Sequence, residues 1–144
     1  MFYEDFTVGQ AFRTPGRRVT AEDIRAFAEL SGDHNAIHLD DAAARAAGFP
    51  GVVAHGALGL ALATGLASRL ELTAGTLIAL AGITWRFRAP VMPGDDIALT
   101  LTVKSARATG KPDRGAVTFT AEVRNQAGVL VQEGEFVEVI RCRR

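Results

Sequence analysis

Residues 51–70 read GVVAHGALGLALATGLASRL, a long apolar run around which the rest of the chain must be organised. It predicts a helix from about Gly56 to about Leu70. Alanine and glycine are more frequent in it than bulky apolar residues, so the helix suits close packing inside a protein. Because it is apolar on nearly all sides, we expect other elements to wrap it.

The apolar run from Val52 to Ser68 approaches the length that spans a bilayer. However, it contains His55, and it is rich in alanine and glycine rather than in leucine and isoleucine. These features favour a core helix over a membrane span. We therefore predict no association with a membrane.

From Thr76 onward the hydrophobic pattern has a period of two, which is typical of half-buried strands. Apolar residues alternate with polar or small ones in two series: Ile97, Leu99, Leu101 and Val103, and Val117, Phe119, Ala121 and Val123. Turn sequences at 93–95, 110–113 and 127–128 separate four long runs at hairpin spacing, which predicts an antiparallel meander. In the last run the pattern shifts phase around Gly134, which indicates a β-bulge there.

The first fifty residues predict a short strand ending near Val19 and two short helices. Thr20 and Asp23 resemble a capping box at the start of the first helix, and Gly32 stands where a glycine ends such a helix. Asp40 can cap the second helix, which we expect from Asp41 to Ala47, and Gly48 would end it. We expect residues 33–39 to form a non-helical connection between the two.

These patterns predict an α+β fold in which a curved antiparallel sheet wraps around one long apolar central helix. At 144 residues the chain has the length of one domain, so we expect a single domain over residues 1–144. One sheet face cannot easily cover a helix that is apolar nearly all round. We therefore expect a second subunit to bury more of it, as in a homodimer.

The composition excludes several classes of protein. Acidic and basic residues are equal at 16 each, so the chain lacks the basic excess of most nucleic-acid-binding proteins. Cys142 is the only cysteine, which rules out an internal disulfide and fits a reducing compartment. The sequence from Met1 to Asp5 lacks the features of a secretory signal, so we expect a cytoplasmic enzyme.

Three polar residues, Asp33, Asn35 and His38, lie close together on the connection after the first helix. A carboxylate and an imidazole can share general acid and general base work near neutral pH. The spacing permits both to reach one water molecule. A purely structural alternative stays open, in which Asp33 forms an Asx-turn and His38 binds a carbonyl.

The second candidate group is His55 with Gly56, at the start of the long helix. Unpaired N–H groups and the helix dipole at such a terminus can bind an oxygen that becomes negative during a reaction. A glycine there allows a ligand to approach closely, although it can equally serve tight packing. Thr64, eight residues further on, lies on nearly the same helix face, where it either contacts substrate or bonds back to its own helix.

The three histidines, His34, His38 and His55, show no metal-ligand spacing, so we expect no metal site. No Gly-x-Gly-x-x-Gly or phosphate-loop motif is present. We therefore expect no redox or nucleotide cofactor.

Together these residues resemble the MaoC-like dehydratase family of hot-dog folds, which includes the (R)-specific enoyl-CoA hydratases. The resemblance spans nearly the whole chain. It rests on four segments in a specific order: Tyr3-Glu4-Asp5-Phe6 with Val8-Gly9, Gly32-Asp33-His34-Asn35-Ala36-Ile37-His38, Val53-Ala54-His55-Gly56, and Phe87-Arg88-Ala89-Pro90-Val91 through Pro93-Gly94-Asp95.

The resemblance implies a role for each candidate residue. Asp33 and His38 match the family's catalytic dyad, which activates water for addition to the 2,3 double bond of an enoyl thioester. The Gly56 N–H matches the donor that polarises the thioester carbonyl, and Thr64 matches a hydroxyl residue near the pocket. Asn35 would order the loop, and His55 would belong to the substrate-binding group.

Two positions depart from the family pattern. Ala36 replaces the usual proline after the motif asparagine, which leaves the loop less pre-organised. Ala57 replaces the usual methionine after the His-Gly pair, which enlarges the acyl pocket. Neither change removes a reacting group.

The function that the sequence predicts best is reversible hydration of a trans-2-enoyl-CoA to an (R)-3-hydroxyacyl-CoA. Coenzyme A is then part of the substrate, and Arg86 and Arg88 are candidates to contact its phosphates. Two alternatives stay open: a hot-dog acyl-CoA thioesterase and a non-catalytic acyl-thioester-binding protein.

Overall fold

The structure is a computed structural model that describes residues 1–143, so Arg144 lies outside the described residues. The helical elements are η1 (Tyr3–Asp5), α1 (Ala21–Ser31), η2 (Ala36–His38), α2 (Asp41–Ala46) and α3 (Gly56–Arg69). The strands are β1 (Ala11–Arg13), β2 (Arg17–Arg18), β3 (Leu77–Phe87), β4 (Asp96–Ala108), β5 (Arg114–Arg124) and β6 (Leu130–Arg141).

The three α-helices begin where their capping residues predict, but the connection expected to be non-helical contains the short helix η2. The Thr20 hydroxyl accepts a hydrogen bond from the Asp23 N–H at 3.1 Å, and the Asp23 carboxylate accepts one from the Thr20 N–H at 2.9 Å. Asp40 caps α2 through the N–H groups of its first turn. The ends of α2 and α3 lie one residue earlier than expected. The expected lead-in strand is two short strands, the second ending at Arg18.

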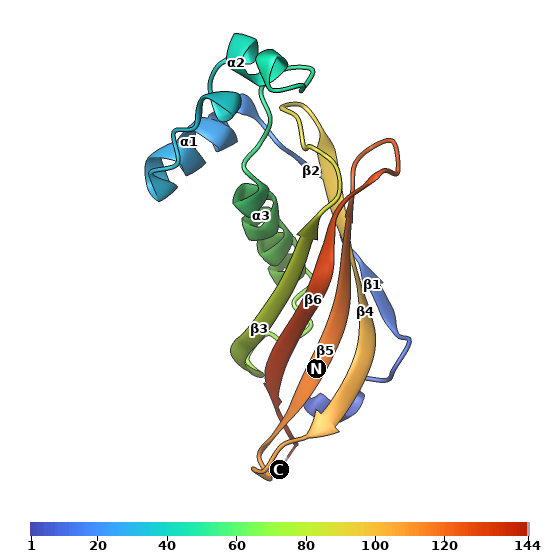
Figure 1. Cartoon of the computed structure of the whole chain (residues 1–144). Coiled ribbons are helices and arrows are strands. Elements are labelled where there is room, and N and C mark those ends of the chain that lie inside the picture. The colour runs from blue at the N-terminus through green and yellow to red at the C-terminus, as the bar shows by residue number, and fades with distance from the viewer. Residues whose placement is uncertain (144) are drawn as a thin grey trace.

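The strand order corrects the predicted meander. In the sheet the order is β1-β4-β5-β6-β3, with β2 paired to β4 off this path. Three strands, β4 to β6, do form a meander, but β3 pairs with β6 rather than with its neighbour in sequence. Its connection therefore crosses one end of the sheet instead of forming a hairpin, and β3 becomes an edge strand (Figure 1).

The bulge expected at Gly134 is also absent, because Gly134 lies in regular register opposite both Trp85 and Ala121. The register of β6 against β5 shifts earlier, beside Leu130 and Gln132. A side chain at position 134 would collide with the Thr84 carbonyl and lie 2.7 Å from the Trp85 ring. The close approach of β3 therefore explains why position 134 is a glycine. The register shift near Gln132 explains why the alternation of apolar and polar residues changes phase in β6.

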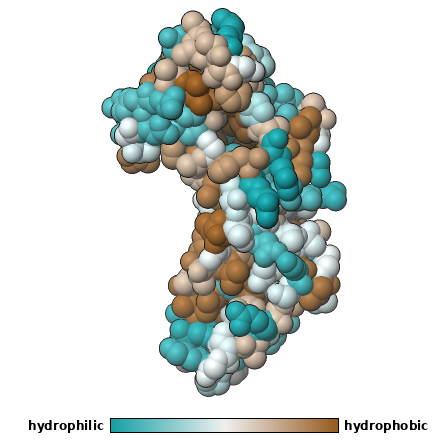
Figure 2. All heavy atoms as spheres, in the orientation of Figure 1, coloured by the Kyte–Doolittle hydropathy of each residue, from teal (hydrophilic) through white to brown (hydrophobic). Residues whose placement is uncertain are grey.

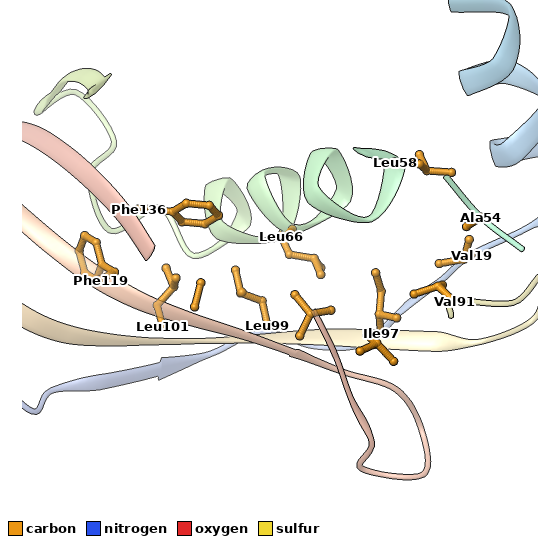
Figure 3. Close-up of a cluster of buried hydrophobic side chains, with 14 of the residues drawn as sticks. Val19, Ala54, Leu58, Leu66, Val91, Ile97, Leu99, Leu101, Phe119 and Phe136 are labelled. Atoms are coloured by element: carbon orange, nitrogen blue, oxygen red, sulfur yellow. The ribbon is translucent and has the colours of Figure 1, made fainter. Parts of the chain in front are cut away.

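The sheet curves around α3, and the core lies between them (Figure 1). Inward-facing residues of the strands pack against the helix, as Figure 3 shows for Leu99, Leu101 and Phe136 beside Leu66. The α+β class and the curved antiparallel sheet are confirmed. The short elements α1 and α2 lie beyond the N-terminal end of α3, away from the main sheet (Figure 1).

The side of the molecule that carries β3 remains apolar at its surface. Leu77, Leu80 and Ile83 of this edge strand are each more than 40% exposed. Figure 2 shows apolar residues gathered along this side. None of the helices in residues 1–143 combines the length and apolar character needed to cross a bilayer.

Candidate active site

A sharp turn between α1 and α2 positions the predicted catalytic residues. Gly32 ends α1 in the left-handed conformation, with φ of 77°. One carboxylate oxygen of Asp33, Oδ1, then accepts a hydrogen bond from the Asn35 N–H at 3.1 Å. Asn35 caps η2 by accepting a hydrogen bond from the Ile37 N–H at 3.3 Å. The turn therefore brings His38 back toward Asp33.

Asp33 and His38 face each other through atoms that the turn leaves free. His38 Nδ1 lies 2.7 Å from the Val53 carbonyl, which only accepts hydrogen bonds. That nitrogen therefore carries the proton, and Nε2 of the neutral ring has a lone pair. The distance from Nε2 to Asp33 Oδ2 is 3.9 Å, too long for a direct hydrogen bond but short enough for one water molecule to contact both.

Both residues also have the structural roles that the sequence allows for them. Asp33 makes the turn with Oδ1, and His38 binds a carbonyl with Nδ1. Each role uses one polar atom of the side chain and leaves the other available. The His38 side chain is 10% exposed and that of Asp33 is 51% exposed, so water reaches the pair from the carboxylate side.

His55 lies behind the pair as a buried support. Its Nε2 is 2.9 Å from the Asp33 carbonyl oxygen, and its ring stacks on His38 with centroids 3.8 Å apart. The ring of Phe27, from α1, packs edge-on against it at 5.0 Å. Within residues 1–143, the buried His55 Nδ1 has no hydrogen-bond partner. His55 therefore contacts both members of the pair.

The first turn of α3 presents two free donors beside the pair. The N–H groups of Leu58 and Gly59 bind the His55 carbonyl, whereas those of Gly56 and Ala57 have no acceptor among residues 1–143. The ring of Phe87 packs against Gly56, because a side chain there would lie 2.7 Å from it. This terminus can stabilise a developing negative charge on an oxygen.

A mostly apolar pocket joins His38 to the start of α3. It is lined by Ile37, His38, Phe49, Val53, Ala54, Gly56, Ala57, Phe87, Arg88, Ala89, Pro90, Val91 and Gln132. Ala57 contributes only a methyl group to this wall. Arg88 is one of the lining residues, and its guanidinium forms a 2.9 Å ion pair with Glu133.

The structure brings together five of the six predicted site residues and leaves Thr64 apart. Thr64 lines a different pocket, beside Glu71, Leu77 and Glu138. Its hydroxyl donates to the Ala61 carbonyl at 2.7 Å, which is the back-bonded arrangement. A role for Thr64 in substrate binding therefore stays a prediction.

Phe87 and Gln132 are among the lining residues to which the sequence assigns no role in the site. Phe87 ends β3, and Gln132 belongs to β6, where the residue is only 3% exposed. A buried polar residue in an alternating strand was the available sign for Gln132. Its partners are far away in sequence, so the pattern alone did not reveal its contacts.

Asp33, His38 and His55 are also close enough to be considered as metal ligands, with one ligand atom from each within 4.8 Å of the others. The geometry argues against such a site. The imidazole rings are only 26° from parallel, so their in-plane lone pairs do not converge on one point. A tetrahedral zinc ion would require the rings to turn away from their carbonyl partners.

His34 follows Asp33 in the same loop, but its side chain lies at the surface and pairs with Glu29. Its Nε2 is 2.9 Å from a Glu29 carboxylate oxygen. The hydrogen bond to Glu29 raises the pKa of His34 above its ordinary value. His34 therefore offers a natural comparison for His38, because it shares the loop but not the pocket.

Solved structures with a similar fold define the fold class. The structure of a MaoC-like dehydratase from Rhodospirillum rubrum, 32% identical, matches with a TM-score of 0.86 over 100% of this chain and 99% of that chain. A conserved hypothetical protein from Mycobacterium tuberculosis with a double hot-dog fold matches at 0.87, with 22% identity, over 99% of this chain and 44% of that one. The curved sheet around α3 is therefore a hot-dog fold.

Sequence comparison gives the family. The model of the MaoC like domain matches residues 5–125. The (R)-specific enoyl-CoA hydratase of Aeromonas caviae is 32% identical over 137 residues, which cover 95% of this chain and 97% of that protein. The chain belongs to the MaoC-like family.

Proposed function

We propose that this protein is a hydro-lyase that reversibly hydrates a trans-2-enoyl-CoA to an (R)-3-hydroxyacyl-CoA. Relatives named as (R)-specific enoyl-CoA hydratases and as a 3-hydroxyacyl-thioester dehydratase support this class of enzyme. In the proposal Asp33 and His38 hold and activate the water. Gly56 polarises the thioester carbonyl.

The observation that carries the proposal is a pair of polar atoms without another role, one of them on His38, which lines the pocket, and the other on the neighbouring Asp33. Asp33 Oδ2 and His38 Nε2 lie 3.9 Å apart, and the lone pair on Nε2 can accept a proton from a water between them. The dyad then returns a proton to C2 of the substrate. No step requires a metal or a redox cofactor.

The start of α3 completes the proposed chemistry. Adding hydroxide at C3 moves negative charge onto the thioester oxygen, and the free N–H groups of Gly56 and Ala57 can bind that oxygen. The apolar lining of the pocket suits an acyl chain, with Ala57 leaving room beside it. Arg88, one of the lining residues, is the better placed of the two candidate phosphate contacts.

A homodimer is part of the proposal. Among residues 1–143 no strand pairs with the outer edge of β3. Its exposed apolar residues would be buried from water by a partner. A second copy of the chain can extend the sheet across this edge and cover the exposed side of α3. A cytoplasmic location and one domain over residues 1–144 complete the proposal.

The function is tested by following two products in one sample. Purified protein is given trans-2-butenoyl-CoA, and the enoyl absorbance is recorded together with thiol release by a colorimetric reagent. We expect the absorbance to fall without thiol release, and chiral chromatography to find the (R)-3-hydroxy product.

Thiol release at the rate of substrate loss would instead identify a thioesterase. Saturable binding without either reaction, over enoyl thioesters of several chain lengths, would identify a binding protein. Either result would overturn the proposed reaction.

A further inference from the structure

We infer that Gln132 is a positioning residue for the carbonyl-binding end of the pocket. Its carboxamide holds the first peptide plane of α3, and Trp85 holds the carboxamide. The inference rests on the proposed function of the α3 terminus in binding the thioester carbonyl. It assigns a role in that site to two residues outside the Asp33–His38 pair.

The contacts form a chain from the sheet to the helix. Trp85 Nε1 donates to Gln132 Oε1 at 2.8 Å, and Gln132 Nε2 donates to the Gly56 carbonyl at 3.2 Å. The three residues come from β3, β6 and α3. The first turn of the helix is therefore tied to two neighbouring strands.

The chemistry of the donors fixes the orientation of the carboxamide. An indole N–H only donates hydrogen bonds, so the atom that faces Trp85 must be the oxygen of Gln132. The amide nitrogen then faces Gly56, whose carbonyl only accepts. Replacing Trp85 by a residue without a donor would leave the amide free to turn.

Gln132 acts on the same peptide unit that contains a free donor. The Gly56 carbonyl and the Ala57 N–H belong to one planar peptide group. A hydrogen bond to that carbonyl fixes the direction of the N–H and polarises it as a donor. The same hydrogen bond from Gln132 restrains the backbone of Gly56 and so the direction of its own N–H.

Gly59 provides the space for this contact. A side chain at position 59 would lie 2.7 Å from the carboxamide carbon of Gln132 and even closer to its nitrogen. By contrast, a side chain at Gly65 in the same helix would have nothing within 4 Å. The two glycines therefore offer a matched pair of variants.

The test measures how strongly the protein polarises a bound carbonyl. The probe is butyryl-CoA labelled with ¹³C at the thioester carbonyl, which is saturated and does not react. Infrared difference spectra record its C=O stretch when it is bound to wild type, Gln132→Leu, Gln132→Glu, Trp85→Phe, Gly59→Ala and Gly65→Ala. Turnover of the enoyl substrate is measured alongside, with folding checked by circular dichroism.

We expect the wild type to shift the C=O stretch to lower frequency, and Gly65→Ala to keep the full shift. Gln132→Leu and Gly59→Ala should lose most of it and lower kcat by about 10- to 100-fold, less than the loss of a whole donor, while KM changes little. Gln132→Glu keeps the acceptor for Trp85 but loses the donor to Gly56, so it should behave like Gln132→Leu. Trp85→Phe should show a smaller loss.

A full shift in folded Gln132→Leu and Gln132→Glu would overturn the inference while leaving the proposed function intact. If the wild type bound the probe without lowering its C=O stretching frequency, the α3 terminus would not polarise the carbonyl. The inference about Gln132 would then fail as well. If that wild-type protein still hydrated the enoyl substrate, the proposed hydration reaction would remain supported. The two failures are thus distinguishable.

Discussion

At the scale of single residues, the proposed dyad depends on side chains that do two things at once. Oδ1 of Asp33 and Nδ1 of His38 hold the loop, and the opposite atoms face each other. The motif is therefore an Asx-turn and a carbonyl-bound histidine as well as a candidate acid/base pair. The two interpretations considered from the sequence are compatible.

The loop position Ala36 can accept the proline that is usual in the family. The preceding Asn35 has ψ of 134°, which is the conformation that proline requires before it. Ala36 is also the first residue of η2, where a proline fits. We predict that Ala36→Pro stabilises the fold by about 0.4 to 1 kcal/mol, because it restricts the unfolded chain.

Urea denaturation measures this effect. Ala42→Pro, which removes an N–H bonded to Asp40, is a control that should destabilise the protein. A lower stability in Ala36→Pro would show that the loop has another conformation.

The sequence predicts some of the candidate site residues but not others. Asp33, Asn35 and His38 are close in sequence, and His55 with Gly56 marks a helix start, so their types and spacing identified them. Gln132 was missed because its role depends on contacts with Trp85 and Gly56, 47 and 76 positions away. Such contacts exist only after the strands have paired.

At the scale of elements, the capping residues predict the start of each α-helix correctly. Asp23 closes the capping box of α1 and pairs with Arg17. The hydrogen bond from Arg17 holds the pKa of Asp23 below its ordinary value. The charged form of Asp23 is therefore the one that stabilises the fold.

We predict that Asp23→Asn lowers the free energy of unfolding by about 1 kcal/mol at pH 7. Since the folded-state pKa is lowered, this contribution is present above the unfolded pKa of about 4 and is lost as pH falls through the folded value. Denaturation curves of both proteins at pH 7 and at pH 3 measure the difference. A gap that is as wide at pH 3 as at pH 7 would contradict the assigned charge.

The strand pattern was less informative, because alternation shows that a strand exists but not which strand it pairs with. The runs of β3 and β4 are separated by a turn sequence, yet β3 pairs with β6. The change of phase around Gly134 likewise predicts a bulge that the structure does not contain at that residue. The reason for the glycine, the approach of Thr84 and Trp85, depends on that unexpected pairing.

The β3–β6 pairing predicts different outcomes for two glycine variants. Gly134→Ala should lower the free energy of unfolding by about 3 kcal/mol, since the added methyl group collides with the β3 backbone. Gly82→Ala, in the facing strand, should change it by less than about 1 kcal/mol, because its nearest neighbour would be 3.9 Å away. Thermal denaturation compares them, and equal effects would argue against the pairing.

At the scale of the whole molecule, the open edge of β3 predicts self-association. Ile83→Lys places a charge among the exposed apolar residues of that edge and should convert a dimer into monomers. Val8→Lys replaces an apolar residue that is 64% exposed elsewhere and should leave the dimer intact. Sedimentation equilibrium reports the masses. A monomeric wild type, or a dimeric Ile83→Lys, would contradict the proposed interface.

The whole fold brings the loop, the α3 terminus and the pocket to one place, where we propose that Asp33 and His38 activate water. The most direct test is the rate of enoyl-CoA hydration by wild type, Asp33→Asn, His38→Ala and His34→Ala, all with unchanged circular dichroism. We predict losses of about 100- to 10,000-fold for the first two variants and a near-wild-type rate for His34→Ala. Wild-type rates in both Asp33→Asn and His38→Ala would contradict the account.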